Sequence, residues 1–130
     1  ENRQLDNDAR AFNTLIGKAR SKAAFLEYPE GCTGLINFVL QSEDNSRGVK
    51  NKITYYASCA SGNSESVSEE VLIGSEFTSN FTIVFLPSTG NIESGAPVEV
   101  TIQSLKGTSR TKKITIDPFS NAKNVIGNEN

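Results

Sequence analysis

The longest regular pattern of apolar and polar positions in this chain covers residues 1–28. Apolar residues recur there in steps of three and four, which places them on one stripe of a helix: Leu5, Ala9, Phe12, Ile16, Ala19, Ala23 and Leu26. The polar and small residues of the pattern fall on the opposite side: Asp6, Arg10, Asn13, Gly17 and Arg20. Pro29 disfavours helical geometry at Tyr28, so the helix is predicted to end there.

The rest of the chain alternates between short apolar runs and polar turn clusters, which is typical of antiparallel β-structure. Residues 34–42 and 52–58 form the first pair of predicted strands, and the polar segment between them favours a hairpin. Residues 60–70 show no apolar period and are predicted to be a loop. The later strands are expected at residues 71–77, 81–86, 97–105 and 112–117.

Residues 81–86 are almost continuously apolar, and a strand of this kind is expected at the centre of a sheet with both faces covered. Residues 120–130 are predicted to be a tail in which Val125 and Ile126, with the preceding Phe119, can dock on the domain while the polar residues after them are disordered. The chain therefore reads as one α+β domain, with a helix at 1–28, a β domain at 32–119 and a tail. Six residues of the helix are expected to pack on the sheet: Leu5, Phe12, Ile16, Ala19, Ala23 and Leu26.

The chain contains two cysteines, Cys32 and Cys59. Cys32 precedes the first strand of the predicted hairpin and Cys59 follows the second, so both lie at its open end. An even cysteine count in a small polar domain favours a disulfide and an oxidising compartment. Two buried free thiols in a cytosolic protein are the alternative.

The composition of the chain excludes several classes of catalytic site. The 130 residues carry a net charge of -2 and contain no histidine, which removes the usual near-neutral general base and the histidine-dependent nucleophile systems. We therefore expect no enzyme activity, no cofactor, no metal and no small-molecule substrate. The sequence also lacks methionine, so we expect a processed or truncated chain.

Charge is unevenly distributed along the chain. The segment between Lys52 and Lys106 contains six glutamates and no basic residue, whereas the segment from Lys106 onward has a net charge of +3. The basic residues at its start could contact nucleic acid: Lys106, Arg110, Lys112 and Lys113. A solvated hairpin tip is the simpler interpretation, because the net charge of the chain opposes binding to a polyanion.

Two further motifs have simple structural interpretations. The pentapeptide LPSTG at residues 86–90 matches a sortase signal, but a folded pattern follows it, so a turn with a positive φ at Gly90 is expected. Acidic pairs at Glu69 with Glu70 and at Glu43 with Asp44 lack the spacing of calcium ligands. These carboxylates are expected to be solvated.

Three segments together carry a resemblance to a known family: residues 19–23 (ARSKA), residues 81–90 (FTIVFLPSTG) with Phe85 ahead of a turn glycine, and the closing KKITIDPF strand. The chain resembles the minor pseudopilins of type II secretion and the minor pilins of type IV pili. The resemblance implies a pilin-like fold, in which one long helix packs on one antiparallel sheet or on two small sheets. It also implies an upstream membrane helix, removed from this chain and preceded by a leader that a prepilin peptidase cleaves.

The functional expectation is a structural and assembly subunit of an extracytoplasmic filament, at or near its tip. Its partners would be other pilins or pseudopilins, and it would be anchored in the cytoplasmic membrane before assembly. Three alternatives stay open: a secreted ligand-binding or adhesin module, a DNA-binding minor pilin in DNA uptake, and a small hydrolase that uses carboxylates.

Overall fold

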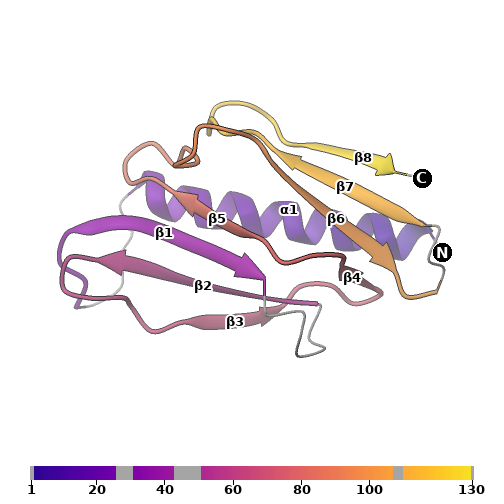
Figure 1. Ribbon diagram of the computed structural model, residues 1–130, viewed down its shortest axis with the longest axis horizontal. Coiled ribbons are helices and arrows are strands. Elements are labelled where there is room, and N and C mark those ends of the chain that lie inside the picture. Colours follow the sequence, from indigo (N-terminus) through magenta and orange to yellow (C-terminus); the bar gives the residue numbers. More distant parts are fainter. Residues whose placement is uncertain (1, 26–30, 43–50, 107–109, 130) are drawn as a thin grey trace.

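The computed structural model describes residues 2–25, 31–42, 51–106 and 110–129. The first element is the helix α1, Asn2–Ala24, and all later elements are strands. Figure 1 shows α1 running along the long axis of the domain behind the strands. The helix thus runs along most of the length of the domain.

One stripe of α1 supplies the helical part of the core, as its apolar period requires. Five of the six residues expected to pack on the sheet are buried: Leu5, Phe12, Ile16, Ala19 and Ala23. The sixth, Leu26, lies outside the described residues. The helix ends with a hydrogen bond from Phe25 N to Ser21 O at 2.9 Å.

The first sheet consists of β1 (Leu35–Ser42), β2 (Lys52–Cys59), β3 (Val67–Glu70) and β5 (Thr82–Phe85). Its strand order is β3-β2-β1-β5, and every neighbouring pair is antiparallel. The predicted hairpin is present as the β1–β2 pair. Cys59 pairs with Leu35 at the open end of this hairpin.

The second sheet consists of β4 (Ser75–Phe77), β6 (Val98–Ser104), β7 (Thr111–Ile116) and β8 (Val125–Glu129). Its order is β4-β6-β7-β8, again with antiparallel neighbours. In β6 and β7 apolar residues point inward at alternate positions, as a half-solvated strand requires: Val100, Ile102, Ile114 and Ile116 are buried.

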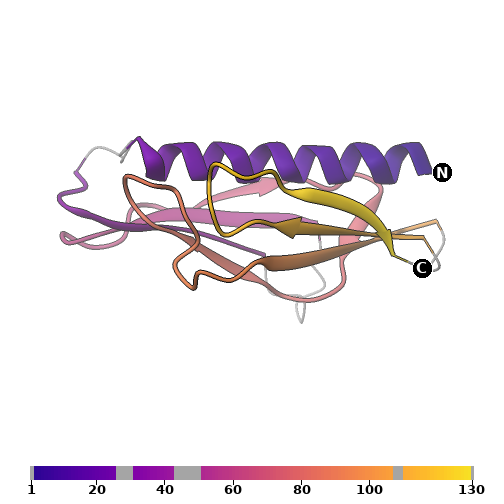
Figure 2. The same cartoon turned by 90° about the horizontal axis from the view of Figure 1, so that it is seen from above.

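Both sheets lie on the same side of α1, as Figure 2 shows. Three phenylalanines join the helix to the strands, with edge-to-face ring contacts and centroid separations of 5.0 to 5.6 Å. Phe12 comes from α1, Phe77 from β4 and Phe81 from the segment before β5. Because β4 and β5 belong to different sheets, this cluster packs the helix and both sheets into one core.

The pilin-like fold class predicted from the sequence is corrected by the structure. The described residues form one helix and two separate four-stranded antiparallel sheets, an arrangement compatible with the broader α+β class, and no pilin fold is shown. β4 pairs with β6 and β5 pairs with β1, so the strands belong to two sheets that lie on the same side of α1.

Three local predictions are also wrong. The segment 60–70 contains β3, and the expected tail contains β8, because both short strands are held by backbone pairing to β2 and β7. The apolar run at residues 81–86 contains β5, which is an edge strand and not a central one. Its buried residues alternate, and Phe85 also bridges to Ile92 in the following loop.

Candidate functional site

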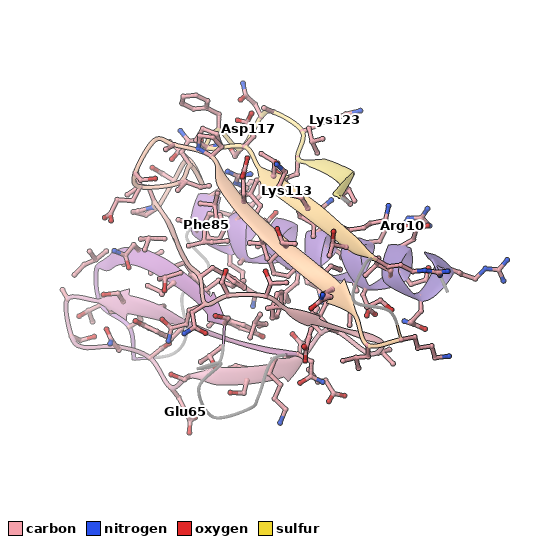
Figure 3. All side chains as sticks on the ribbon, turned by 45° about the vertical axis from the view of Figure 1, so that its right-hand side comes forward. Arg10, Glu65, Phe85, Lys113, Asp117 and Lys123 are labelled. Carbon is pink, nitrogen blue, oxygen red and sulfur yellow. A yellow bond between two sulfur atoms is a disulfide. The ribbon has the colours of Figure 1, made fainter. Side chains whose placement is uncertain are left out.

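Arg20 joins the C-terminal part of α1 to two distant segments of the chain. Its side chain is buried; Nε donates to Gly90 O at 2.9 Å, and a terminal guanidinium nitrogen donates to Asp117 O. The guanidinium carbon lies 5.4 Å from the ring centroid of Phe85, a cation–π contact. Figure 3 shows where the Phe85 and Asp117 side chains lie relative to the helix.

Burial sets the electrostatics at this position. Desolvation lowers the pKa of the Arg20 guanidinium, and the Asp117 carboxylate acts in the opposite direction. The two backbone carbonyls compensate for part of the lost hydration, because a buried charge needs hydrogen-bond partners. Arg20 therefore holds three segments together: α1, the loop after β5 and the end of β7.

The loop after β5 approaches α1 very closely. Gly90 has a φ of +73°, as predicted for this turn, and a β-carbon there would lie 2.8 Å from Arg20 O and 3.3 Å from Ala24 Cβ. Ser88 N donates to Ala23 O at 3.0 Å, which satisfies one of the carbonyls left open at a helix C-terminus. This loop therefore serves as the cap of α1.

Asp8 provides the corresponding attachment near the start of α1. Its carboxylate is buried and accepts hydrogen bonds from Ile73 N at 3.1 Å, Gly74 N at 2.9 Å and Ser75 Oγ at 2.6 Å. Gln4 Nε2 adds a fourth at 3.0 Å. Four hydrogen-bond donors replace the hydration that the buried carboxylate has lost, so Asp8 fixes the first half of α1 to the segment that enters β4.

Sequence reasoning missed both attachment residues. The helical pattern placed Arg20 on the outward face, but the side chain is buried. The correction follows from the two carbonyls and the ring of Phe85, which surround the guanidinium. Asp8 carried one usable signal, because it lies three positions after Leu5 and four before Phe12, which is the spacing of the apolar stripe.

Once α1 is fixed in this way, its outer face is left uncovered. Arg3, Arg10 and Lys18 are exposed there, together with small or uncharged exposed residues: Asn7, Ala11, Thr14, Gly17 and Ser21. The two acidic residues described in α1 lie elsewhere, since Asp8 is buried and Asp6 bonds to Lys112 at 2.8 Å. We refer to the residues exposed between Arg3 and Ser21 as the outer face of α1; its charge is positive.

A groove of about 480 Å³ runs along one flank of the outer face. Lys18, Ser21 and Lys22 line it from the helix, and Tyr55 of β2 and Glu69 of β3 line it from the first sheet. The groove thus presents positive charge on one wall and a carboxylate on the other. Leu15 and Ala19 of α1 also line the groove, so it combines charged and apolar surface.

The four basic residues proposed for nucleic-acid contact are not gathered on one surface. Lys112 faces α1 through its bond to Asp6, whereas Lys113 lies 3.7 Å from Glu99 of β6, the neighbouring strand. Because successive residues of a strand point to opposite faces, these two lysines are on different sides of the second sheet. Lys106 and Arg110 are exposed at the adjacent β6–β7 connection.

The acidic positions of the chain are dispersed. Glu69 and Glu70 are exposed on the edge strand β3, and Asn51 Nδ2 donates to Glu70 Oε2 at 2.9 Å. The pair Glu43 and Asp44 lies outside the described residues. Within the part of the chain that the structure describes, no three potential metal ligands lie together. Figure 3 places Glu65 far from the labelled basic residues Arg10, Lys113 and Lys123.

The predicted disulfide is confirmed: Cys32 and Cys59 are bonded, with their Cα atoms 5.6 Å apart. The bond ties the segment that enters β1 to the end of β2. Ser61 reinforces this end of the first sheet, since its Oγ accepts from Thr33 N and donates to Gly31 O, both at 3.1 Å.

Two findings bear on the wider context of the chain. Among the residues described, no helix combines the length and apolar character that crossing a membrane requires. Comparison of the sequence and the structure with protein-family models, curated proteins and solved structures gives no match.

Proposed function

We propose that this chain is a structural subunit of an extracytoplasmic filament of the type IV pilus or type II secretion kind, at or near the filament tip. Its function would be carried by surfaces that contact neighbouring subunits of the same filament. The outer face of α1 and the groove beside it are the surfaces we assign to this role.

The proposal rests on how α1 is attached to the two sheets and on which of its faces stays exposed. Asp8 and Arg20 fix the helix to both sheets at two separate points. The outer face bears three exposed cations, and the neighbouring carboxylate of Asp6 is paired with Lys112. A rigid, preorganised surface loses little conformational entropy when it binds a neighbour. Its uniform charge favours a partner surface of opposite sign.

The disulfide supports the proposed location, because such bonds persist in oxidising compartments outside the cytoplasm. The acidic edge strand β3 supports assembly through charge. Glu65 and Glu69 are exposed near this edge, so one subunit carries both a positive and a negative surface. Contacts between unlike surfaces of successive subunits generate open filaments when the rotation between subunits does not close into a ring.

The experiment is incorporation of the full-length protein into filaments in its source cell. Filaments are sheared from the surface and the chain is detected with an antibody against residues 1–130. The variant Arg10→Glu with Lys18→Glu reverses two charges of the outer face, and we expect it to lower the amount incorporated at least about fivefold. Lys123→Glu, which changes an exposed lysine beyond β7, is the matched control and should incorporate normally.

Two results would contradict the proposal. If the wild-type chain is found only as a free monomer in the medium, the secreted-module alternative is favoured. If it is present in filaments but the charge reversals leave its incorporation unchanged, the outer face of α1 is not the subunit contact.

A further inference from the structure

The groove beside α1 lies between the helix and β3, the edge strand of the first sheet. Glu69 and Val67 of β3 pair with Ile53 and Tyr55 of β2, and paired residues point to the same face of a sheet. Ile53 is fully buried in the core to which α1 contributes, so all four side chains are on the α1 side. Val67 is nevertheless 45% exposed, which shows that the helix does not cover β3.

Unlike charges line the two walls of this groove. Lys18 and Lys22 are on the helix wall, and Glu69 is on the strand wall. None of the three has an ion-pair partner among the residues that the structure describes. Leu15 and Ala19 also line the groove but are only 8% and 4% exposed, so they form its floor. The groove therefore has an apolar floor between a positive and a negative wall.

The size of the groove limits the kind of segment that it can hold. Its helical residues run from Leu15 to Lys22, a length of about 10 Å at a rise of about 1.5 Å per residue. A second helix of this length, about 10 Å in diameter with its side chains, would occupy roughly 800 Å³. The groove holds about 480 Å³, so an extended segment fits it better than a helix.

The spacing of the two lysines matches the spacing of side chains in an extended segment. Lys18 and Lys22 are four residues apart in α1, which is about 6 Å along the helix axis. Alternate residues of an extended segment point to the same side and are about 6.6 Å apart. Two acidic residues at alternate positions can therefore face the two lysines, while the residue between them faces Glu69.

We propose that the groove binds an extended segment of a partner protein in which two acidic residues flank one basic residue. The acidic side chains contact the ammonium groups of Lys18 and Lys22, and the basic side chain contacts the carboxylate of Glu69. This inference rests on the proposed function for the identity of the partner, a neighbouring subunit, and deepens it by naming the chemistry of the segment that the groove accepts.

The probes are two blocked peptides of identical composition, with the cores Glu-Lys-Glu and Glu-Glu-Lys flanked by glycine. Each is titrated to millimolar concentration into the isotope-labelled 130-residue chain, and amide chemical shifts are followed by NMR. The alternating peptide should bind at least about threefold more tightly, because only its order directs both acids to the helix wall. Shifts are expected at Gly17 and Ser21, which line the groove, and not at Gly95 or Gly127, which do not.

Charge variants assign the binding to the two walls. Lys22→Gln and Glu69→Gln each remove one ion pair with the alternating peptide, and each should lower its affinity about threefold. Arg10→Gln, which changes an exposed cation of α1 outside the groove, is the matched control and should bind like the wild type. The triple variant Lys18→Glu, Lys22→Glu and Glu69→Lys inverts both walls, so it should prefer a peptide with a Lys-Glu-Lys core.

A steric variant tests the groove without changing its charge. A β-carbon at Gly17 would have no atom within 4 Å, so Gly17→Gln should leave the fold intact while its side chain fills the groove and abolishes peptide binding. Thr14→Gln is the matched control, because Thr14 is exposed one turn earlier on α1 and does not line the groove. This variant should retain binding.

Equal affinity for the two peptides, equal loss in the Gly17 and Thr14 variants, or no binding of either peptide would overturn the proposal. A dimer in sedimentation equilibrium that Gly17→Gln abolishes, without peptide binding, would make the groove a contact between copies of the chain. The filament experiment fails independently of these measurements. A chain that binds the alternating peptide but does not enter filaments would contradict the proposed function and retain this inference, and incorporation without peptide binding would do the reverse.

Discussion

The main chain of Gly90 lies so close to Arg20 that position 90 cannot accept a side chain without movement of the loop. Arg20 Nε donates to Gly90 O at 2.9 Å, while a β-carbon on Gly90 would lie 2.8 Å from the carbonyl oxygen of Arg20. The Arg20 guanidinium reaches the Gly90 carbonyl only when the loop lies against the helix. The loop can lie there only because glycine has no side chain.

Replacement of Gly90 by alanine should therefore destabilise the domain by about 3 kcal/mol, from a positive-φ penalty and a steric clash with the helix backbone. Gly95 offers a matched control, because it has the same φ of +73° and a β-carbon there would have no neighbouring atom within 4 Å. Gly95→Ala should cost only about 1 kcal/mol. Urea unfolding measures the free energy of unfolding of both variants. Equal losses of stability would show that the close approach of Gly90 to Arg20 does not contribute to stability.

Arg20→Lys should destabilise the domain by about 2 kcal/mol, because an ammonium lacks the planar fork that reaches two carbonyls. Amide exchange gives a local readout: Gly90 N donates to Leu86 O and should lose protection more than Gly95 N, which donates to Ile92 O. The exposed Arg10→Lys change is the control, with an expected effect within about 0.5 kcal/mol. Similar losses for both arginine variants would argue against the role of Arg20 as an attachment.

The sequence predicted those elements whose apolar residues repeat regularly. The buried stripe of α1 and the β1–β2 hairpin both follow such a period, and the disulfide follows from where the two cysteines lie on that hairpin. β3 could not be predicted in this way. All four of its residues are exposed, so the strand exists through backbone hydrogen bonds to β2 and has no apolar pattern.

The attachment residues were hidden for a different reason. The groups that compensate for the charges of Asp8 and Arg20 are mostly backbone amides and carbonyls, 65 to 97 positions away in the chain. Backbone groups have no signature in the residue types of a sequence. A buried charge with such partners is therefore indistinguishable from a solvated one until the tertiary fold brings the segments together.

Asp8→Asn should cost about 2 to 3 kcal/mol, because the amide nitrogen would face the N–H and O–H donors that now bond to the carboxylate. Amide exchange at Ile73 and Gly74 should accelerate, since both groups donate to Asp8. Asp6→Asn is the same change two positions away. It removes only a partly exposed ion pair with Lys112 and should cost at most about 1 kcal/mol. Equal effects of the two changes would contradict the assigned role of Asp8.

Reduction of the Cys32–Cys59 bond should lower the free energy of unfolding by about 3.5 kcal/mol, the chain-entropy value for a loop of 27 residues. The bond closes the β1–β2 hairpin far from Asp8, so protection at Ile73 should fall no more than the global stability does. Unfolding is followed with and without reductant, in the wild type and in Cys32→Ala with Cys59→Ala. The double variant should match the reduced wild type and not respond to reductant. A decrease in the free energy of unfolding below about 1 kcal/mol would contradict this value. It would show that residual pairing of β1 with β2 restricts the unfolded chain even without the bond.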